Sequence, residues 1–364
     1  MSFPRLNVYD SGLQLNNRYK FKDLPMSENQ PYQPRIAVIG AGLAGLTCAT
    51  ALKGLASVKV FEASVFVGGR VSRHQFGENR FDFGEQYFTV STPLFLNIVE
   101  AWKRAGLVRD YEGWLIELEK GQITNLTDHA QRYSGYPTMQ SIADNLAQST
   151  DVTLSTSITE VEKQDNGQWR LFDGRGSYQG LFDIVIIATA AHQVAALAQS
   201  VPAISELSRQ IDMTVCWSAV FDFPEALGLP FDAAFVRDSP LSWVSRYQDL
   251  DKAPGSGESW VMHCSPEWSL QYAASFRGRV MHALLDSFFE AIDIAPQKPS
   301  ASNVHCWKHA VPINTIDQDC VFDEKSAMGA CGDWCTAPRI EGAVLSGFSM
   351  ADRVMKHIKK KNHE

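Results

Sequence analysis

The sequence predicts a mixed α/β protein in which a discontinuous Rossmann-like nucleotide-binding domain carries an inserted domain with a mixed sheet. A continuous apolar run at 35–39 leads directly into a cluster of glycines, as expected for a parallel strand buried on both faces of its sheet. Similar runs return at 182–190 and near 330. Parts of the long segment at 205–312 alternate between apolar and polar residues, which indicates a second domain inserted into the first.

The first half of the nucleotide-binding domain begins with the strand at 35–39. A helix with small side chains follows at 43–54, and a second strand at 58–63 completes a β-α-β unit. Residues 1–34 are polar and weakly periodic, so we expect an N-terminal extension there.

Further along the chain, helices are expected at 94–106, where Gly106 ends the apolar spacing, and at 138–148. Asn166-Gly167 lies between alternating segments and predicts a hairpin that leads into the strand at 182–190. These elements assign 35–90, 150–204 and 313–364 to the nucleotide-binding domain, and 91–149 with 205–312 to a substrate domain.

The composition narrows the class of protein. The chain has 364 residues and a formal net charge of -8, which argues against a binder of nucleic-acid backbones. No run approaches the roughly 20 apolar residues of a membrane-spanning helix, and no export signal is apparent. Seven scattered cysteines indicate reduced thiols and a cytoplasmic location. Cys331 and Cys335 lack the further ligands of a zinc site, so no metal is expected.

Gly40, Gly42 and Gly45 form a G-x-G-x-x-G pattern directly after the first strand. The first glycine allows a tight turn, the second lets the backbone approach a pyrophosphate, and the third lets helix and strand pack closely. Glu62, at the end of the second strand, is placed to accept hydrogen bonds from ribose hydroxyls. The pattern predicts a bound dinucleotide, and the alternative is a tight turn that holds no ligand.

Three features favour FAD over NAD. Gly69 allows a second close backbone approach, and Arg70 can bind a diphosphate with two parallel hydrogen bonds. The strand at 182–190 follows an antiparallel hairpin, as the return strand of FAD-type folds does. Asp333 can bond a ribityl hydroxyl, and the helix that begins at Gly342 can direct its positive end at the isoalloxazine ring.

Seven blocks resemble the FAD-dependent oxidoreductases of the amine-oxidase superfold, and within it the bacterial renalase-like proteins. They are VIGAGLAGL, FVGGRVSR, RFDFGEQYFTV, LSWVSR, HCSPEWS, HCWKHAVP and GDWCTAPRIEGAVLSG, in the family's order from about residue 36 to 355. The resemblance implies an amine-oxidase or p-hydroxybenzoate-hydroxylase-like architecture with noncovalent FAD lying across both domains. The implied FAD-binding residues are Gly40, Ala41, Gly42, Leu43, Ala44, Gly45, Glu62, Ala63, Gly69, Arg70, Glu85, Gln86, Tyr87, Val161, Gly332, Asp333, Arg339, Glu341, Gly342 and Ala343.

The resemblance also implies a reaction. Renalase-like enzymes use FAD to oxidise dihydro isomers of NAD(P)H, with hydride transfer to flavin N5 and reoxidation by O₂ to give H₂O₂. Such chemistry needs little acid–base assistance, so orientation of the small-molecule substrate is the protein's main task. The side chains expected around the substrate are Gln86, Tyr87, Trp243, Arg246, Trp307 and His309. Structural roles remain open for the two tryptophans as core aromatics, for Arg246 as an ion-pair partner and for His309 as a buried histidine.

The chain departs from the family pattern at two places near the expected site. Phe83 and Glu85 stand where the family more often has His and Ala, and Lys308 and His309 stand in a block that usually reads W-R-Y-A-x-P. A carboxylate at Glu85 changes the electrostatics beside the flavin if it points inward.

Two other functions fit the sequence. A flavin amine oxidase takes a hydride from the carbon beside a neutral amine and favours a lysine near flavin N5, a role for which Lys308 is the candidate. Alternation along a strand would put Lys308 on the face opposite Trp307 and His309. The other function is a binding module without catalysis, which holds no nucleotide or holds FAD only structurally and recognises a protein or lipid. The intact GGR and GDW blocks weigh against it.

Overall fold

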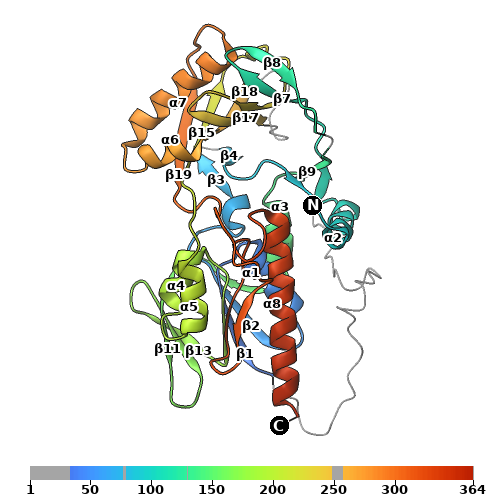
Figure 1. Ribbon diagram of the computed structural model, residues 1–364, viewed down its shortest axis with the longest axis vertical. Helices are drawn as coiled ribbons and strands as arrows, with labels where there is room; N and C mark the ends of the chain where they lie inside the picture. The colour runs from blue at the N-terminus through green and yellow to red at the C-terminus, as the bar shows by residue number, and fades with distance from the viewer. Residues whose placement is uncertain (1–32, 77–78, 129, 248–256, 364) are drawn as a thin grey trace.

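The computed structural model describes residues 33–363 apart from 77–78, 129 and 248–256. Nearly all of the predicted N-terminal extension, residues 1–34, therefore lies outside the described residues. Two lobes are stacked along the long axis (Figure 1): one holds α1 (Leu43–Ala51) and α8 (Ile340–Lys361), the other α6 (Pro266–Gln271) and α7 (Arg277–Ile292). The predicted mixed α/β class is confirmed.

A six-stranded sheet forms the centre of the first lobe. Its order is β10 (Asp151–Thr153), β2 (Ser57–Phe61), β1 (Arg35–Ile39), β14 (Ile184–Ile187), β21 (Met328–Ala330) and β20 (Val321–Asp323). All neighbouring pairs are parallel except β20 with β21. Because β1 has β2 on one side and the much later β14 on the other, the strand order reverses there. Ligands of such sheets bind at the carboxyl ends of the strands beside this point.

Both faces of this sheet are covered, which explains why β1 is apolar on both sides. On one face, Ile36 and Val38 share a core with α1, α8, α2 (Pro93–Arg104) and α3 (Ser141–Ala147). On the other face, Ala37 and Ile39 share a core with α4 (Ala191–Leu197), α5 (Pro202–Arg209) and a three-stranded sheet of β11 (Ile158–Lys163), β12 (Trp169–Asp173) and β13 (Tyr178–Phe182). The β11–β12 hairpin turns at Asn166-Gly167 as predicted, with Gly167 at φ +85°.

α2 and α3 pack in the core of the first lobe, although the sequence grouped 91–149 with the substrate domain. Phe95 of α2 and Ile142 of α3 belong to the same cluster as α1. From this segment, β7 (Leu115–Glu119) and β8 (Gln122–Asn125) join the large sheet of the second lobe. The helical spacing of apolar residues shows which face of a helix is buried, but it does not show which lobe the helix packs against.

A seven-stranded sheet organises the second lobe. Its order is β19 (Ala301–Trp307), β15 (Cys216–Phe223), β18 (Glu258–Cys264), β17 (Leu241–Tyr247), β16 (Ala233–Val236), β7 and β8. α7 covers one face, where Phe288 packs with Val244 and Trp260. The other face contacts the hairpin of β3 (Arg73–Phe76) and β4 (Asn79–Asp82), which Figure 1 shows between the lobes.

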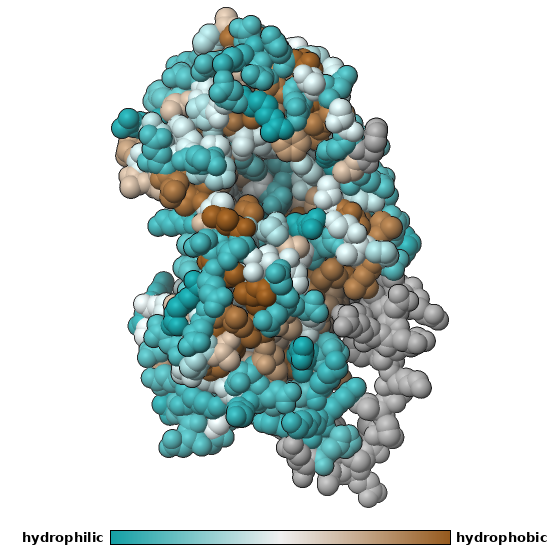
Figure 2. Space-filling model, viewed as in Figure 1, coloured by the Kyte–Doolittle hydropathy of each residue, from teal (hydrophilic) through white to brown (hydrophobic). Residues whose placement is uncertain are grey.

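A small sheet of β5 (Phe88–Thr89), β9 (Arg132–Gly135) and β6 (Val108–Asp110) lies beside this hairpin at the waist (Figure 1). Apolar side chains gather at the same waist on the face seen in Figure 2. The waist is therefore where both lobes bring their inner surfaces together.

Candidate functional site

The carboxyl ends of the parallel strands open onto a cavity of about 610 Å³. Gly40 follows β1, Glu62 follows β2, Thr189 lies beyond the end of β14, and Asp333 lies beyond the end of β21. All four line the cavity. Segments separated by up to about 300 residues thus meet at one edge of the sheet, as the switch-point rule predicts.

The glycine loop after β1 depends on the absence of side chains. Gly40 has φ +107°, and a Cβ there would lie 2.6 Å from the carbonyl oxygen of Ala188. A Cβ on Gly45 would lie 2.0 Å from the carbonyl oxygen of Gly40. Gly42 borders open space and is the N-cap of α1, for which no side chain of the described residues supplies a capping bond. The N–H groups of the first helical turn therefore remain available to a phosphate at the cavity wall.

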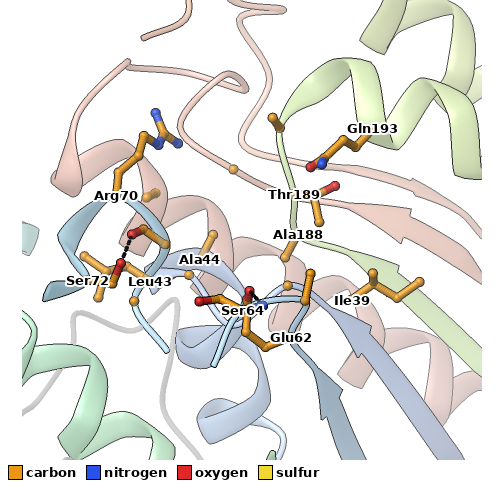
Figure 3. A pocket seen from close by; sticks show the side chains of 18 of the residues that line it. Ile39, Leu43, Ala44, Glu62, Ser64, Arg70, Ser72, Ala188, Thr189 and Gln193 are labelled. Atoms are coloured by element: carbon orange, nitrogen blue, oxygen red, sulfur yellow. Dashed lines mark hydrogen bonds between the residues drawn. The ribbon is translucent and has the colours of Figure 1, made fainter. Parts of the chain in front are cut away.

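Glu62 holds this loop from the neighbouring strand. Its Oε2 accepts a hydrogen bond from the Ala41 N–H at 2.8 Å. Its Oε1 accepts one at 2.8 Å from the N–H of Ser64, which lies beside Glu62 in Figure 3. A carboxylate has further lone pairs beyond these two bonds. Glu62 therefore orders two backbone segments and can still accept a ribose hydroxyl.

Arg70 and Asp333 form a two-pronged ion pair in the cavity wall. Arg70 Nη2 donates to Asp333 Oδ1 at 2.6 Å, and Nη1 donates to Oδ2 at 2.7 Å and to the carbonyl oxygen of Ala310 at 2.9 Å. Burial opposes the charged form of Arg70, but the Asp333 carboxylate raises the guanidinium pKa above its ordinary value. Within the described residues, two of the five guanidinium N–H groups remain without a partner. The sequence assigned both residues to the cofactor but did not predict their pairing.

Aromatic rings close the cavity at the second lobe. Trp307 and His305 of β19 line it together with His74 of β3. The ring centroid of His305 lies 4.4 Å from that of His74 and 4.4 Å from that of Trp307. Burial lowers the pKa of His305 to about 4, and His74 and Arg277 add to this effect. This end of the cavity therefore presents uncharged, flat surfaces near neutral pH.

The residues present fit a flavin dinucleotide. The N-termini of α1 and α8 both border the cavity, at Gly42–Ala44 and at Arg339–Ile340, and neither has a side-chain cap among the described residues. The hydroxyl of Thr189 is buried there without a hydrogen-bond partner in the described part of the chain. Two sets of free N–H donors, an orphaned hydroxyl and an aromatic end match phosphates, sugar hydroxyls and a flat ring system.

Comparisons with known proteins point in the same direction. Residues 38–102 match a family model described as an NAD(P)-binding Rossmann-like domain. Renalase of Mus musculus is 23% identical over 350 residues, which cover 89% of this chain and 99% of renalase. The chain is a flavin oxidoreductase that resembles renalase over most of its length.

Solved structures share the fold of this renalase-like chain. One is a protein assigned as a protoporphyrinogen oxidase from Exiguobacterium, with a TM-score of 0.71 and 12% identity over 89% of this chain and 99% of that one. Another is an engineered putrescine oxidase with redesigned cofactor binding, with a TM-score of 0.70 and 13% identity over 89% and 99% of the two chains. At these identities the likeness concerns the fold.

Most of the residues that the sequence assigned to the cofactor line the cavity of the renalase-like chain. They are Gly40, Gly42, Leu43, Ala44, Glu62, Ala63, Gly69, Arg70, Glu85, Gly332, Asp333, Arg339 and Ala343. Among the residues assigned to the substrate, Trp307 lines it. The assignment of roles to these residues stays a prediction.

Other residues assigned to the cofactor do not line the cavity: Ala41, Gly45, Gln86, Tyr87, Val161, Glu341 and Gly342. Glu341 is buried, and its carboxylate accepts hydrogen bonds from the Ser91 N–H and the Thr92 hydroxyl at the start of α2. Val161 packs on the core, and the cavity is lined instead by 156–159, which precede and begin the same strand. The sequence located the strand but not which part of it reaches the cavity.

Tyr87 and Trp243 meet in an aromatic cluster outside the cavity lining. Their ring centroids are 5.3 Å apart, and Tyr111 lies 5.8 Å from Tyr87. The indole N–H of Trp243 is buried without a hydrogen-bond partner among the described residues. Gln86 is turned back to its own loop, where Nε2 donates to the carbonyl oxygens of Asp82 and Gly84.

Arg246 and His309 have partners within the protein. Arg246 Nη2 donates to the carbonyl oxygens of Leu229 and Phe231, and Nη1 lies 3.4 Å from the carboxylate of Glu258. The ring of His309 stacks on that of His192 with centroids 3.5 Å apart. Arg246 thus has the ion-pair contact of its structural alternative, whereas His309 is half-buried; the roles of both residues stay predictions.

Sequence reasoning missed several residues that line the cavity: Ser64, Ser72, His74, Thr156, Ser157, Ile158, Thr159, Ala188, Thr189, Ala190, Gln193 and His305. Two available signals point to some of them. Thr189 follows a predicted parallel strand, whose carboxyl end belongs to the ligand edge. His305 is two residues before Trp307, so alternation along the strand puts both on one face.

The described part of the chain contains no group of three or more His, Cys, Asp or Glu side chains arranged to hold a metal ion. In the same residues, no helix combines the length and the apolar character needed to cross a bilayer.

Proposed function

We propose that this chain binds FAD noncovalently and oxidises a dihydronicotinamide isomer of NAD(P)H, with O₂ as the final acceptor and H₂O₂ as its product. Bound FAD supplies the hydride acceptor, N5, and the centre that O₂ reoxidises. The residues of the chain bind and orient both molecules and keep water from the reacting carbon.

The cavity supports this cofactor assignment. The free N–H groups at Gly42–Ala44 and the remaining guanidinium N–H groups of Arg70 suit the diphosphate, and Glu62 suits the ribose. The N-terminus of α8 borders the cavity and favours negative charge, such as that of a reduced flavin.

One observation carries the substrate assignment. Trp307 and His305 line the cavity, whereas Lys308 is exposed and lies outside its lining. A dihydronicotinamide needs a flat surface that orients its ring and no base, because hydride loss gives an aromatic pyridinium without a separate proton transfer. Lys308, the lysine that an amine oxidase would need near the flavin, is therefore not part of the cavity wall.

Anaerobic stopped-flow spectroscopy of the purified flavoprotein tests the proposal. Dihydronicotinamide isomers are expected to bleach the flavin absorbance within seconds, and Trp307→Ala to slow this step at least about tenfold because the orienting surface is lost. Lys308→Ala is the matched control, since Lys308 lies outside the cavity lining, and should retain the wild-type rate. Bleaching by primary amines, with none by dihydronicotinamides, would refute the proposal in favour of an amine oxidase.

The same experiment tests the noncatalytic alternative. A protein that binds no flavin after reconstitution, or whose flavin is bleached neither by dihydronicotinamides nor by amines, would be a binding module.

The seven cysteines are all free thiols, which supports the proposed cytoplasmic location.

A further inference from the structure

Glu85 brings to the cavity wall a carboxylate that has no hydrogen-bond partner among the described residues. The carboxylate of Glu62 accepts two backbone N–H groups, and that of Asp333 is paired with Arg70. Within the described residues, the carboxylate of Glu85 has neither a hydrogen bond nor an ion pair where it lines the cavity. Burial and the nearby Asp333 carboxylate raise the pKa of Glu85, whereas the Arg70 guanidinium lowers it and favours the ionised form. A charged group left free in a binding cavity is available to a ligand.

Close packing holds Glu85 where the two lobes meet. The N–H of Glu85 donates to the carbonyl oxygen of Arg70 at 3.2 Å. A Cβ on Gly84 would lie 1.9 Å from that same oxygen and 3.5 Å from Cζ2 of Trp307. The loop therefore lies against the arginine segment of the first lobe and the last residue of β19 in the second. The backbone hydrogen bond to Arg70 therefore holds the main chain of Glu85 at this junction.

When the Glu85 carboxylate is ionised, the charged side chains of the cavity sum to a net negative charge. The charged side chains that line the cavity are the carboxylates of Glu62, Glu85 and Asp333 and the guanidinium groups of Arg70 and Arg339. Arg70 is already paired with Asp333, and Arg339 donates to the hydroxyl of Ser91. Burial lowers the pKa values of the cavity histidines His74 and His305, so they carry no compensating charge near neutral pH.

The chemistry of the proposed reaction creates a positive charge on the substrate. A C–H bond of the neutral dihydropyridine breaks, both electrons leave with the hydrogen to the flavin acceptor, and the ring becomes a cationic pyridinium. A fixed carboxylate near that ring stabilises the cation as it forms, more than it stabilises the neutral substrate. We propose, resting on the function proposed above, that Glu85 is a specificity-determining residue which faces the substrate ring and selects rings that become cationic.

Ligand binding to the oxidised holoprotein tests this role without turnover. The N-methylnicotinamide cation and neutral nicotinamide have nearly the same shape and differ in charge. Titration of each, followed by the shift of the flavin absorption bands, yields two dissociation constants. Glu85→Gln is expected to weaken binding of the cation about tenfold and to change binding of nicotinamide less than twofold.

Two further variants distinguish the loss of the Glu85 charge from a general disturbance of the cavity. Glu85→Asp keeps the charge and should keep the preference for the cation, even if both ligands bind more weakly. Glu112→Gln removes an exposed carboxylate outside the cavity and should leave both dissociation constants unchanged. Equal weakening of cation and neutral ligand by Glu85→Gln, or no weakening of either, would overturn the inference.

Reduction kinetics separate this inference from the proposed function. If dihydronicotinamides fail to bleach the wild-type flavin, the proposed function is wrong. If they bleach wild type and Glu85→Gln at the same rate, the proposed function stands and the role of Glu85 is refuted. The expected result is rapid bleaching of wild type and Glu85→Asp, and bleaching of Glu85→Gln that is at least about tenfold slower.

Discussion

At the scale of single residues, the site depends on polar atoms whose partners come from distant parts of the chain. Arg70 and Asp333 are 263 positions apart, and Glu62 reaches Ala41 on a neighbouring strand. The residue types and local spacing predicted that these side chains serve a dinucleotide. Their pairing was not predictable, because no local pattern says which carboxylate a guanidinium will meet.

Arg70→Ala is expected to weaken flavin binding at least about tenfold, or about 1.4 kcal/mol. The change removes N–H donors at the cavity and leaves the buried carboxylate of Asp333 without its partner. Flavin-to-protein absorbance ratios after gel filtration, with FAD titration of the apoprotein, measure the loss. Arg70→Lys should be intermediate because lysine lacks the two-pronged geometry. Glu62→Ala should lose less flavin than Arg70→Ala, and unchanged retention in both would contradict the assigned site.

Asp82 gives a pH dependence of stability. Burial raises the pKa of its carboxyl to about 7, although the Met139 N–H and Arg73 oppose this. In the unfolded chain the carboxyl ionises near pH 4, so the free energy of unfolding falls as pH rises from about 4 to about 7. Asp82→Asn removes this titration and should raise the melting temperature relative to wild type more at pH 8 than at pH 5. The exposed Asp151→Asn is the control, and an equal difference at both pH values would contradict the prediction.

At the scale of elements, the helix and the hairpin that the sequence located correctly have a strong apolar period and a glycine at the end or the turn. The helix expected at 94–106 is α2, Pro93–Arg104, and the hairpin turns at Asn166-Gly167. The sequence did not reveal that α2 packs with α1 rather than in the second lobe. Which neighbour an apolar face meets depends on the whole topology.

The contact between α1 and α8 supplies a prediction at this scale. A Cβ on Gly347 would lie 2.4 Å from the carbonyl oxygen of Ala44, in the first turn of the helix that borders the cavity. Gly347→Ala should therefore push the helices apart, lower the melting temperature by several degrees and weaken flavin binding together. Arg353→Ala, at an exposed position of α8, should leave both unchanged. A stable Gly347→Ala variant with full flavin content would show that the helix contact tolerates the extra carbon.

At the scale of the whole molecule, the cavity joins the edge of one sheet to the inner face of the other. Its lining includes Gly40 and Glu62 from the first lobe and His305 and Trp307 from the second. A ligand that spans these residues stabilises the folded protein, because it binds the native arrangement and not the unfolded chain.

Removal of the flavin is therefore expected to lower the melting temperature, and readdition of FAD to restore it in a concentration-dependent way. At a ligand concentration of 1,000 times Kd the stabilisation amounts to about 4 kcal/mol. Differential scanning calorimetry of apoprotein and holoprotein measures the shift. Arg70→Ala should reduce the shift at equal FAD concentration, whereas a shift of the same size in both proteins would argue that FAD binds elsewhere.

The sequence by itself determined the α/β class, the strand and glycine loop of the dinucleotide site, and the chemical types of residue that serve it. These features depend on the spacing of apolar residues and on backbone conformations that only glycine adopts readily. Both can be recognised from residues that are close together in the sequence. The tertiary structure alone decided that Arg70 pairs with Asp333, that Trp307 lines the cavity whereas His309 does not, and that Glu85 lines it without a hydrogen bond. Those facts depend on which distant segments meet at the waist, and that follows from the packing of two complete lobes.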